Sequence, residues 1–260
     1  MASPASATSG TRSVAIVGTR KATPGGKEAA RTFARELVRM GCAVVSGLAF
    51  GLDAAAHEGA LDGKGYTIAV LATGLDRIYP QWNTKLAERM IASGGALISE
   101  YPPGSPALPY RFLERNRIVS GLAEGVLIIE APERSGSLAT ARFALEQDRQ
   151  VFVVPGPATH PNYAGSHALI RAGAELVTQP AHVLEALGMA AAPQSSGPEA
   201  YSKEEQLIRE AFRTSTEPLA IDTIIRYTKL NAQTVNRTLS LLVIQGAIAE
   251  NGTGYTMKRP

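Results

Sequence analysis

The stretch Gly121-Leu122-Ala123-Glu124-Gly125-Val126-Leu127-Ile128-Ile129-Glu130-Ala131 contains the end of a predicted helix and, from Gly125, a continuous apolar run. An apolar run without alternating polar residues is typical of a parallel strand that is buried on both faces. The segment before it, 110–117, reads Tyr-Arg-Phe-Leu-Glu-Arg-Asn-Arg and combines three arginines with two aromatic rings. The sequence therefore predicts a basic, aromatic helix that leads into a buried parallel strand.

Similar apolar runs recur along the first two thirds of the chain and alternate with helical patterns. The predicted strands are residues 14–17, 42–45, 68–71, 96–99, 125–131, 151–154 and 175–178. Thr23-Pro24 and Asn83 are predicted to begin helices, and Gly41, Gly94 and Gly173 are predicted to end them. Alternating strands and helices indicate an α/β fold with a Rossmann-like, doubly wound and mostly parallel sheet.

The last quarter of the chain has a different pattern. Residues 188–200 are mostly small and include prolines, which is typical of a linker. Helical patterns over 202–212, 221–228 and 232–245 then precede a hairpin around Asn251-Gly252-Thr253-Gly254, so we predict a winged-helix domain, although a small helical docking module would show the same pattern. The predicted divisions are a flexible tail (1–12), a Rossmann-like domain (13–188), a linker (189–200) and a winged-helix domain (201–260).

Composition narrows the class of protein. The net charge is +3 and the isoelectric point is near 9.0, so the chain as a whole is only mildly basic. A nucleic-acid site would therefore be indicated by local clusters of basic residues and not by the total charge. Cys42 is the single cysteine, which excludes an intramolecular disulfide and a cysteine-rich zinc site and fits a reducing cytoplasm. No apolar run has the length of a membrane span, and residues 1–11 lack the apolar core of a secretory signal, so we expect a cytoplasmic protein without a membrane partner.

Three loops rich in glycine or serine follow predicted strands. Gly18 is expected to allow a tight turn, so that the next amides and the helix near Pro24 form an anion site with Arg20 beside it. Ser135-Gly136-Ser137 opens a helix and forms either a second phosphate site or an ordinary helix cap. A third loop starts at Gly47. Because the carboxyl ends of parallel strands share one edge of a sheet, these loops are expected to line one crevice.

The arginines and rings of residues 110–117 suit a nucleic-acid strand. Arginine binds phosphate, and aromatic faces accept unpaired bases. A solvated helix face would have the same composition, but the position next to the strand ends favours a binding role.

Several catalytic chemistries lack their sequence signals. A dinucleotide-binding fingerprint and a phosphate-binding loop of the Walker type are both missing their glycine pattern. The four histidines, His57, His160, His167 and His182, show no metal-ligand spacing, and we predict no metal and no cofactor. Asp53 and His57 are four residues apart on a predicted helix and are a weak candidate for catalysis. The sequence favours a binding protein over an enzyme.

At this point the chain resembles the DprA/Smf family. The resemblance rests on motifs spread over residues 14–187, namely Ala15-Ile16-Val17-Gly18-Thr19-Arg20, the segment 45–57 from Val-Ser-Gly to Ala-His, Gly74-Leu75-Asp76 with Tyr79-Pro80, the segment 112–121, Glu130-Ala131 with Ser135-Gly136-Ser137-Leu138, and the segments 144–147 and 151–156. The combination is specific to the family. The last domain resembles an extension that some members carry.

The resemblance implies a protein that protects incoming single-stranded DNA during natural transformation and loads the RecA recombinase, without catalysis or a cofactor. It implies a single-stranded DNA pocket that contains Arg20, Phe112, Arg115 and Arg117, with Asn116 either binding or bracing the loop. It also implies a homodimer formed around residues 169–176.

One departure from the family affects the expected site, because Phe50 stands where many members have arginine. A basic contact is then either missing or replaced by a ring that can stack. Two alternatives remain open at the level of sequence. The first is a nucleotide hydrolase of the LOG type, which the degraded glycine loop at 135–140 disfavours, and the second is a transcription regulator, which rests on the winged helix alone.

Overall fold

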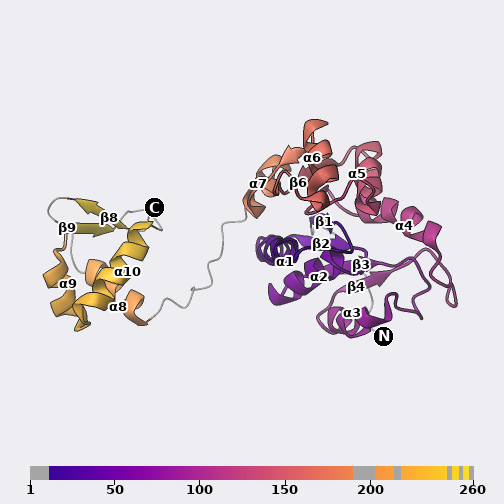
Figure 1. Cartoon of the computed structure of the whole chain (residues 1–260). Helices are drawn as coiled ribbons and strands as arrows, with labels where there is room; N and C mark the ends of the chain where they lie inside the picture. The colour runs from indigo at the N-terminus through magenta and orange to yellow at the C-terminus, as the bar shows by residue number, and fades with distance from the viewer. Residues whose placement is uncertain (1–11, 190–202, 214–217, 245–247, 252–253, 258–260) are drawn as a thin grey trace. The chain divides into compact units, whose positions relative to one another are not determined.

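A computed structural model describes residues 12–189, 203–213, 218–244, 248–251 and 254–257. The chain divides into two compact units, residues 1–194 and 195–260 (Figure 1). The predicted tail and linker lie almost wholly outside the described residues, so their boundaries stay predictions. None of the helices in the described ranges has the length and apolar content that a membrane span requires.

The first unit is built on a seven-stranded sheet in which all neighbouring strands are parallel. Its strand order is β4-β3-β2-β1-β5-β6-β7. The strands are β1 (Ser13–Val17), β2 (Ala43–Ser46), β3 (Thr67–Val70), β4 (Ala96–Ile98), β5 (Gly125–Ile128), β6 (Gln150–Val153) and β7 (Glu175–Leu176). The predicted Rossmann-like, doubly wound sheet is therefore confirmed.

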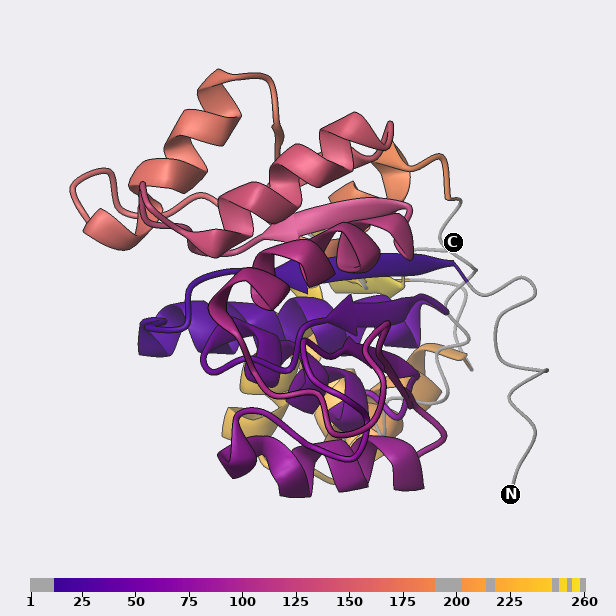
Figure 2. The ribbon, with the colours of Figure 1, turned by 90° about the vertical axis from the view of Figure 1, so that its right-hand side faces the viewer.

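Helices cover both faces of this sheet, as Figure 2 shows from one side. Alternate residues of β1 point to opposite faces, with Val14 and Ile16 in one apolar cluster and Ala15 and Val17 in the other. The first cluster includes α1 (Pro24–Arg39), α2 (Leu52–Asp62) and α7 (Pro180–Ala186), and the second includes α4 (Pro109–Gly121), α5 (Gly136–Glu146) and α6 (Ala164–Arg171). A smaller cluster packs α3 (Thr84–Ala92) against β3.

Helix ends agree with the predictions in most places. Thr23 caps α1 by accepting a hydrogen bond from the Gly26 N–H, and Gly41, Gly94 and Gly173 have positive φ directly after helices. Asn83 stands at the start of α3, but its side chain makes no cap. The Asn83 amide donates instead to the carbonyl oxygen of Leu48, at 2.8 Å, which ties α3 to another loop.

The strand order creates a crevice at one point of the sheet. β1 lies between β2 and β5, and the chain winds outward from β1 in both directions. In open α/β sheets, ligands bind at such a switch point, outside the carboxyl ends of the strands. The loops after β1, β2 and β5 begin there.

The second unit has three helices and a hairpin. These are α8 (Lys203–Arg213), α9 (Ile221–Thr228), α10 (Ala232–Ile244), β8 (Ile248–Asn251) and β9 (Gly254–Met257). Val235, Leu239 and Leu242 of α10 are buried at the predicted spacing, and the residues predicted to face solvent, Gln233, Asn236, Arg237 and Ser240, are exposed. The elements match the predicted pattern, and the winged-helix interpretation stays a prediction.

Candidate functional site

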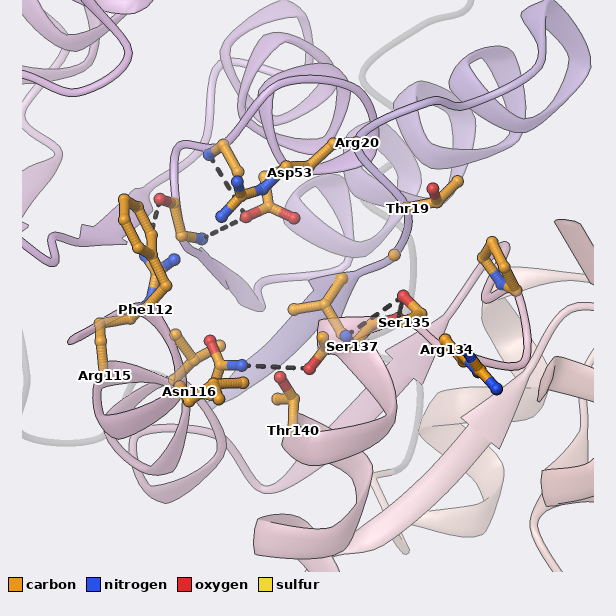
Figure 3. A pocket seen from close by; sticks show the side chains of 18 of the residues that line it. Thr19, Arg20, Asp53, Phe112, Arg115, Asn116, Arg134, Ser135, Ser137 and Thr140 are labelled. Carbon is orange, nitrogen blue, oxygen red and sulfur yellow. Dashed lines mark hydrogen bonds between the residues drawn. The ribbon is translucent and has the colours of Figure 1, made fainter. Parts of the chain in front are cut away.

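A pocket of about 330 Å³ opens at the switch point (Figure 3). Its walls come from the loops after β1, β2 and β5 and from the first turns of α4. Of the predicted site residues, it is lined by Gly18, Arg20, Gly47, Phe112, Arg115, Asn116, Ser135, Gly136 and Ser137. The prediction that three loops line one crevice is confirmed.

Arg20 and Phe112 form a stacked pair at this pocket. The Arg20 guanidinium carbon lies 4.8 Å from the centre of the Phe112 ring. The centre of the Tyr79 ring lies 5.3 Å from the centre of the Phe112 ring, and the two ring planes are tilted against each other. Arg20 is exposed, and no ion pair of the described residues includes it. The charge of Arg20 also acts to lower the pKa of the buried Asp53. An exposed cation that lies on an aromatic ring and forms no ion pair is available for a phosphate.

Arg115 lines the pocket, but unlike Arg20 it is buried. Its side chain is only 3% exposed and donates hydrogen bonds to the carbonyl oxygens of Gly47, at 2.7 Å, and Val70. These two oxygens lie at the ends of β2 and β3. Arg115 therefore anchors α4 to the sheet beneath the pocket.

A buried carboxylate balances this buried cation. Asp53 accepts hydrogen bonds from the backbone N–H groups of Gly47 and Ala49, at 3.1 and 3.3 Å. Burial raises the pKa of Asp53, and the charge of Arg115 acts against that shift; burial lowers the pKa of Arg115, and Asp53 opposes it. Each charge thus partly offsets the cost of burying the other.

Arg117 lies outside the pocket, against the prediction that it lines the site. Its guanidinium forms an ion pair with Glu100. Asn116 does line the pocket, and its amide donates to the carbonyl oxygen of Gly136 at 3.1 Å. This contact joins α4 to the start of α5, so Asn116 braces the loop, which is one of its two predicted roles.

The start of α5 faces the pocket. Ser135 caps the helix by accepting from the Ser137 N–H at 3.3 Å, so the ordinary helix cap is present. A Cβ atom added to Gly136 would meet no atom within 4 Å. The positive end of this helix dipole is therefore open on the pocket side and suits an anion.

The start of α1, by contrast, is already occupied, which corrects the predicted anion site near Pro24. The Glu130 carboxylate accepts from the backbone N–H of Thr23 at 3.1 Å and from the Thr23 hydroxyl. Asn162 and Tyr163 donate to it as well, at 2.9 and 3.0 Å. The protein's own carboxylate thus fills the position that an external phosphate would take.

Glu130 stays charged in this buried setting. Burial by itself would raise the pKa of Glu130, but the hydrogen bonds from Thr23, Asn162 and Tyr163 stabilise the carboxylate and hold the pKa below its usual value. The backbone N–H of Thr19 donates to the Glu130 carbonyl oxygen at 2.8 Å. The same residue therefore also fixes the loop that carries Arg20.

Two glycines are required by close packing. A Cβ on Gly18 would come within 2.1 Å of Leu52, and one on Gly47 within 2.3 Å of the Arg115 guanidinium. Gly18 does not have a positive φ, so close approach, and not the predicted tight turn, explains it.

His57 and Asp53 do not form the weakly predicted catalytic pair. The His57 Nδ1 lies 2.6 Å from the Thr67 hydroxyl, which donates to Val44, so Nδ1 carries the proton. Burial, together with the charge of Arg115, lowers the pKa of His57 to about 3. In the part of the chain that the structure describes, no three acidic, histidine or cysteine side chains are grouped to hold a metal ion.

The residues that the sequence did not predict for the site include a cation in the pocket and an aromatic ring beside it. Arg134, in the loop after β5, lines the pocket on the side of Ser135, opposite Arg20 and Phe112 (Figure 3). Arg134 directly precedes Ser135 of the predicted serine loop, and this position in the sequence could have indicated that it belongs to the site. Tyr79 belongs to a motif of the chain, but its contact with Phe112 joins residues 33 positions apart and has no signature in sequence.

Comparison with known proteins decides the family. The model of the family described as DNA recombination-mediator protein A matches residues 4–188, which include the whole sheet and every wall of the pocket. The chain belongs to this family. The DprA/Smf resemblance is thereby confirmed.

Relatives and solved structures agree with this assignment. The Escherichia coli protein Smf is 40% identical over 253 residues, which are 95% of this chain and 68% of that protein. DNA processing protein A from Streptococcus pneumoniae superposes with a TM-score of 0.63 at 42% identity, covering 67% of this chain and 61% of that one. The Helicobacter pylori protein, solved for its single-stranded DNA binding mode, gives 0.62 at 35% identity over 68% and 80% of the two chains. The chain spans between 44% and 68% of the length of several curated family members.

We predict that Arg115 and Arg117 differ in their effect on stability. Replacing Arg115 with Met leaves Asp53 buried without its cation, which should lower the free energy of unfolding by about 3 kcal/mol. Replacing Arg117 with Ala removes an exposed ion pair and should change it by less than about 1 kcal/mol. Urea unfolding of both variants checks this, and equal effects would contradict the structural role of Arg115.

A second prediction concerns Glu130 and pH. Because the folded pKa lies below the unfolded value of about 4.5, the carboxylate stabilises the fold fully above that pH, and the stabilisation is lost as the pH falls through the folded pKa. Glu130→Gln should cost about 2 kcal/mol at pH 7 and flatten the loss of stability in acid.

The matched control is Glu133→Gln, which changes an exposed carboxylate three residues away. Its stability curve from pH 3 to 7 should follow that of the unchanged protein. If the stability of Glu130→Gln also followed that of the unchanged protein over this pH range, the Glu130 carboxylate would not stabilise the fold.

Proposed function

We propose that the pocket at the switch point binds single-stranded DNA and that the protein holds the strand without cutting or modifying it. The observation that carries the proposal is the Arg20–Phe112 pair beside the open start of α5. Together they supply a cation, an aromatic face and a helix N-terminus within one pocket. A phosphate and an unpaired base need these three groups.

The pocket favours single strands over duplex DNA. The Phe112 ring can stack on a base only when that base has left its duplex partner. Arg20, Arg134 and the N–H groups of α5 interact with phosphates, which carry no sequence information. Binding should therefore depend weakly on sequence.

The family supplies the biological setting of this proposal. The Helicobacter pylori relative is described as binding single-stranded DNA, and the family as a recombination mediator. We infer that this chain, in the cytoplasm, protects incoming strands during transformation and passes them to the RecA recombinase.

The residues at the pocket support binding and not catalysis. Asp53 is committed to two backbone N–H groups, and neutral His57 is committed to Thr67. Neither side chain stands as a general acid or base with a second group beside it. This favours a binding protein over a nucleotide hydrolase.

A homodimer is the second part of the proposal. A groove of about 290 Å³ runs between α5 and α6 and is lined by Leu138, Arg142, Leu145, Gly165, Ala168, Leu169 and Ala172. Leu145 is 62% exposed there, and Leu176 on the edge strand β7 is also exposed. This face includes much of the range 169–176, where the family resemblance implies the dimer contact. Two pockets in one dimer would hold one strand with avidity.

The second unit contributes less to strand binding in this account. The exposed residues of α10 are Ala232, Gln233, Asn236, Arg237, Ser240 and Leu241, and only Arg237 among them is charged. A protein surface that binds duplex DNA usually needs several phosphate contacts. We propose that this unit docks a partner or assists the first.

For strand binding, we predict that Arg20→Ala and Phe112→Ala each weaken the affinity for an oligothymidine at least fivefold, because each loses a contact worth about 1–3 kcal/mol. Fluorescence anisotropy of a labelled strand measures this. Arg20→Ala should also lower the slope of log affinity against log salt by about 0.7, the value for one phosphate contact on a single strand.

The control is Arg237→Ala, an exposed arginine of the second unit, which should bind as the unchanged protein does. A duplex of matched length should bind more weakly than the single strand. If the duplex bound equally well, or if Arg237→Ala alone weakened binding, the proposed pocket would not be the DNA site.

For the dimer, we predict that Leu145→Arg shifts the protein to a monomer at micromolar concentration, because a second cation beside Arg142 would be buried in the contact without an acidic partner from the groove. Sedimentation velocity measures the change. Leu241→Arg, at an exposed leucine of the second unit, should leave the dimer intact. A monomeric unchanged protein at the same concentration would refute the proposed dimer.

A further inference from the structure

A group of exposed aromatic side chains lies next to the pocket. Phe50 follows the Gly47 loop and is exposed, and so is Tyr79, whose ring contacts Phe112. Trp82, the single tryptophan of the chain, is 86% exposed. Large aromatic side chains left in water by the fold are typical of binding surfaces.

The segment that carries Trp82 is tied to the pocket on both sides. Before Trp82, the Tyr79 ring packs against Phe112, which lines the pocket. After it, the Asn83 amide donates to the carbonyl oxygens of Leu48 and Ala49, at 2.8 and 3.4 Å, and Ala49 also lines the pocket. The short helix η2 (Gln81–Asn83) is therefore held against the pocket wall, and Trp82 projects from it.

The fold does not explain this position of Trp82. The apolar cluster beneath it uses Leu86, Ala87 and Met90 of α3 and does not include the indole. Burying the indole would have stabilised the fold, because apolar surface removed from water contributes to stability. The contacts of its neighbours fix the backbone here while the ring stays free for a ligand.

We propose, as an extension of the proposed function, that unpaired bases leaving the pocket past Phe112 and Tyr79 stack on Trp82. The strand would then follow a row of rings that begins with the Arg20–Phe112 pair. Tyr79 and Trp82 are three residues apart, so their Cα atoms are at most about 11 Å apart. A strand bound in the pocket reaches Trp82 within a few nucleotides.

The charges along this path suit a nucleic-acid backbone. Lys85 is exposed and follows Trp82 by three residues in a helical stretch, which places the two side chains on the same side. Two carboxylates belong to this region. Asp76 accepts from the Gly104 N–H at 2.8 Å and lies 3.9 Å from the Arg77 guanidinium, whereas Glu88 is exposed and follows Lys85 by three residues on α3. Lys85 is nearer to Trp82 along the chain than Glu88 is, so a phosphate beside Trp82 would meet the cation first.

Tryptophan emission tests the proposal directly, because Trp82 is the only source of that signal. The full chain is titrated with oligothymidines of increasing length while anisotropy of a terminal dye reports total binding. Emission should stay constant for strands that fill the pocket alone and fall for longer strands that reach Trp82. An abasic strand of the same length keeps the phosphates but should leave emission unchanged.

Three variants complete the design. Trp82→Ala should weaken binding of the longer strands at least fivefold and leave the shortest strands unaffected, whereas Trp82→Phe, which keeps a ring, should bind within twofold of the unchanged protein. Tyr66→Ala is the matched control, because Tyr66 is also an exposed ring but directly precedes β3, so it lies at the amino ends of the strands, away from the pocket at their carboxyl ends. It should bind normally.

The outcome separates this inference from the function on which it rests. If the unchanged protein binds long strands and Arg20→Ala does not, but emission stays constant and Trp82→Ala binds normally, the path over Trp82 is wrong and the pocket stands. If no strand of any length binds, the proposed function itself fails.

Discussion

The buried guanidinium of Arg115 is the constraint on which the rest of the site depends. Its hydrogen bonds to the carbonyl oxygens of Gly47 and Val70 fix α4 across the ends of β2 and β3, and its charge stabilises Asp53 beneath the Gly47 loop. Phe112 stands one turn earlier on the same helix and is thereby held against Arg20. The buried cation Arg115 thus positions Phe112, which packs on the exposed cation that we propose to bind DNA, Arg20.

Of the two helix N-termini near the pocket, one is occupied by a carboxylate of the protein and the other is open. Glu130 occupies the start of α1 with its own carboxylate, while the start of α5 stays open at Gly136. Because a helix N-terminus attracts anions, the start of α5 is the one of these two positions that is free for the phosphate in the proposed function. The same Glu130 backbone holds Thr19, so this choice and the placement of Arg20 are linked.

The sheet was predictable because a strand that is buried on both faces has to be apolar throughout. The observed strand ends differ from the predicted ones by a residue or more, because flanking apolar residues such as Ile129 stay buried after the strand has ended. The convergence of the loops followed from the parallel order. The roles of the arginines did not follow from composition. Helical spacing could have indicated that Arg115 is buried and Arg117 is not, because Arg115 shares a face of α4 with the apolar residue Val119 and Arg117 does not. Glu130 had no such signal, because Asn162 and Tyr163 are over thirty residues away.

Hydrogen–deuterium exchange of the full chain, with and without an oligothymidine, tests the location of the strand most directly. The account predicts slower exchange at the loops 18–20, 47–51 and 132–138 and at the start of α4, with little change in α9 and α10. Protection confined to residues 221–244, with the loops of the pocket exchanging as in the free protein, would contradict the claim that the switch point of the sheet is the DNA site.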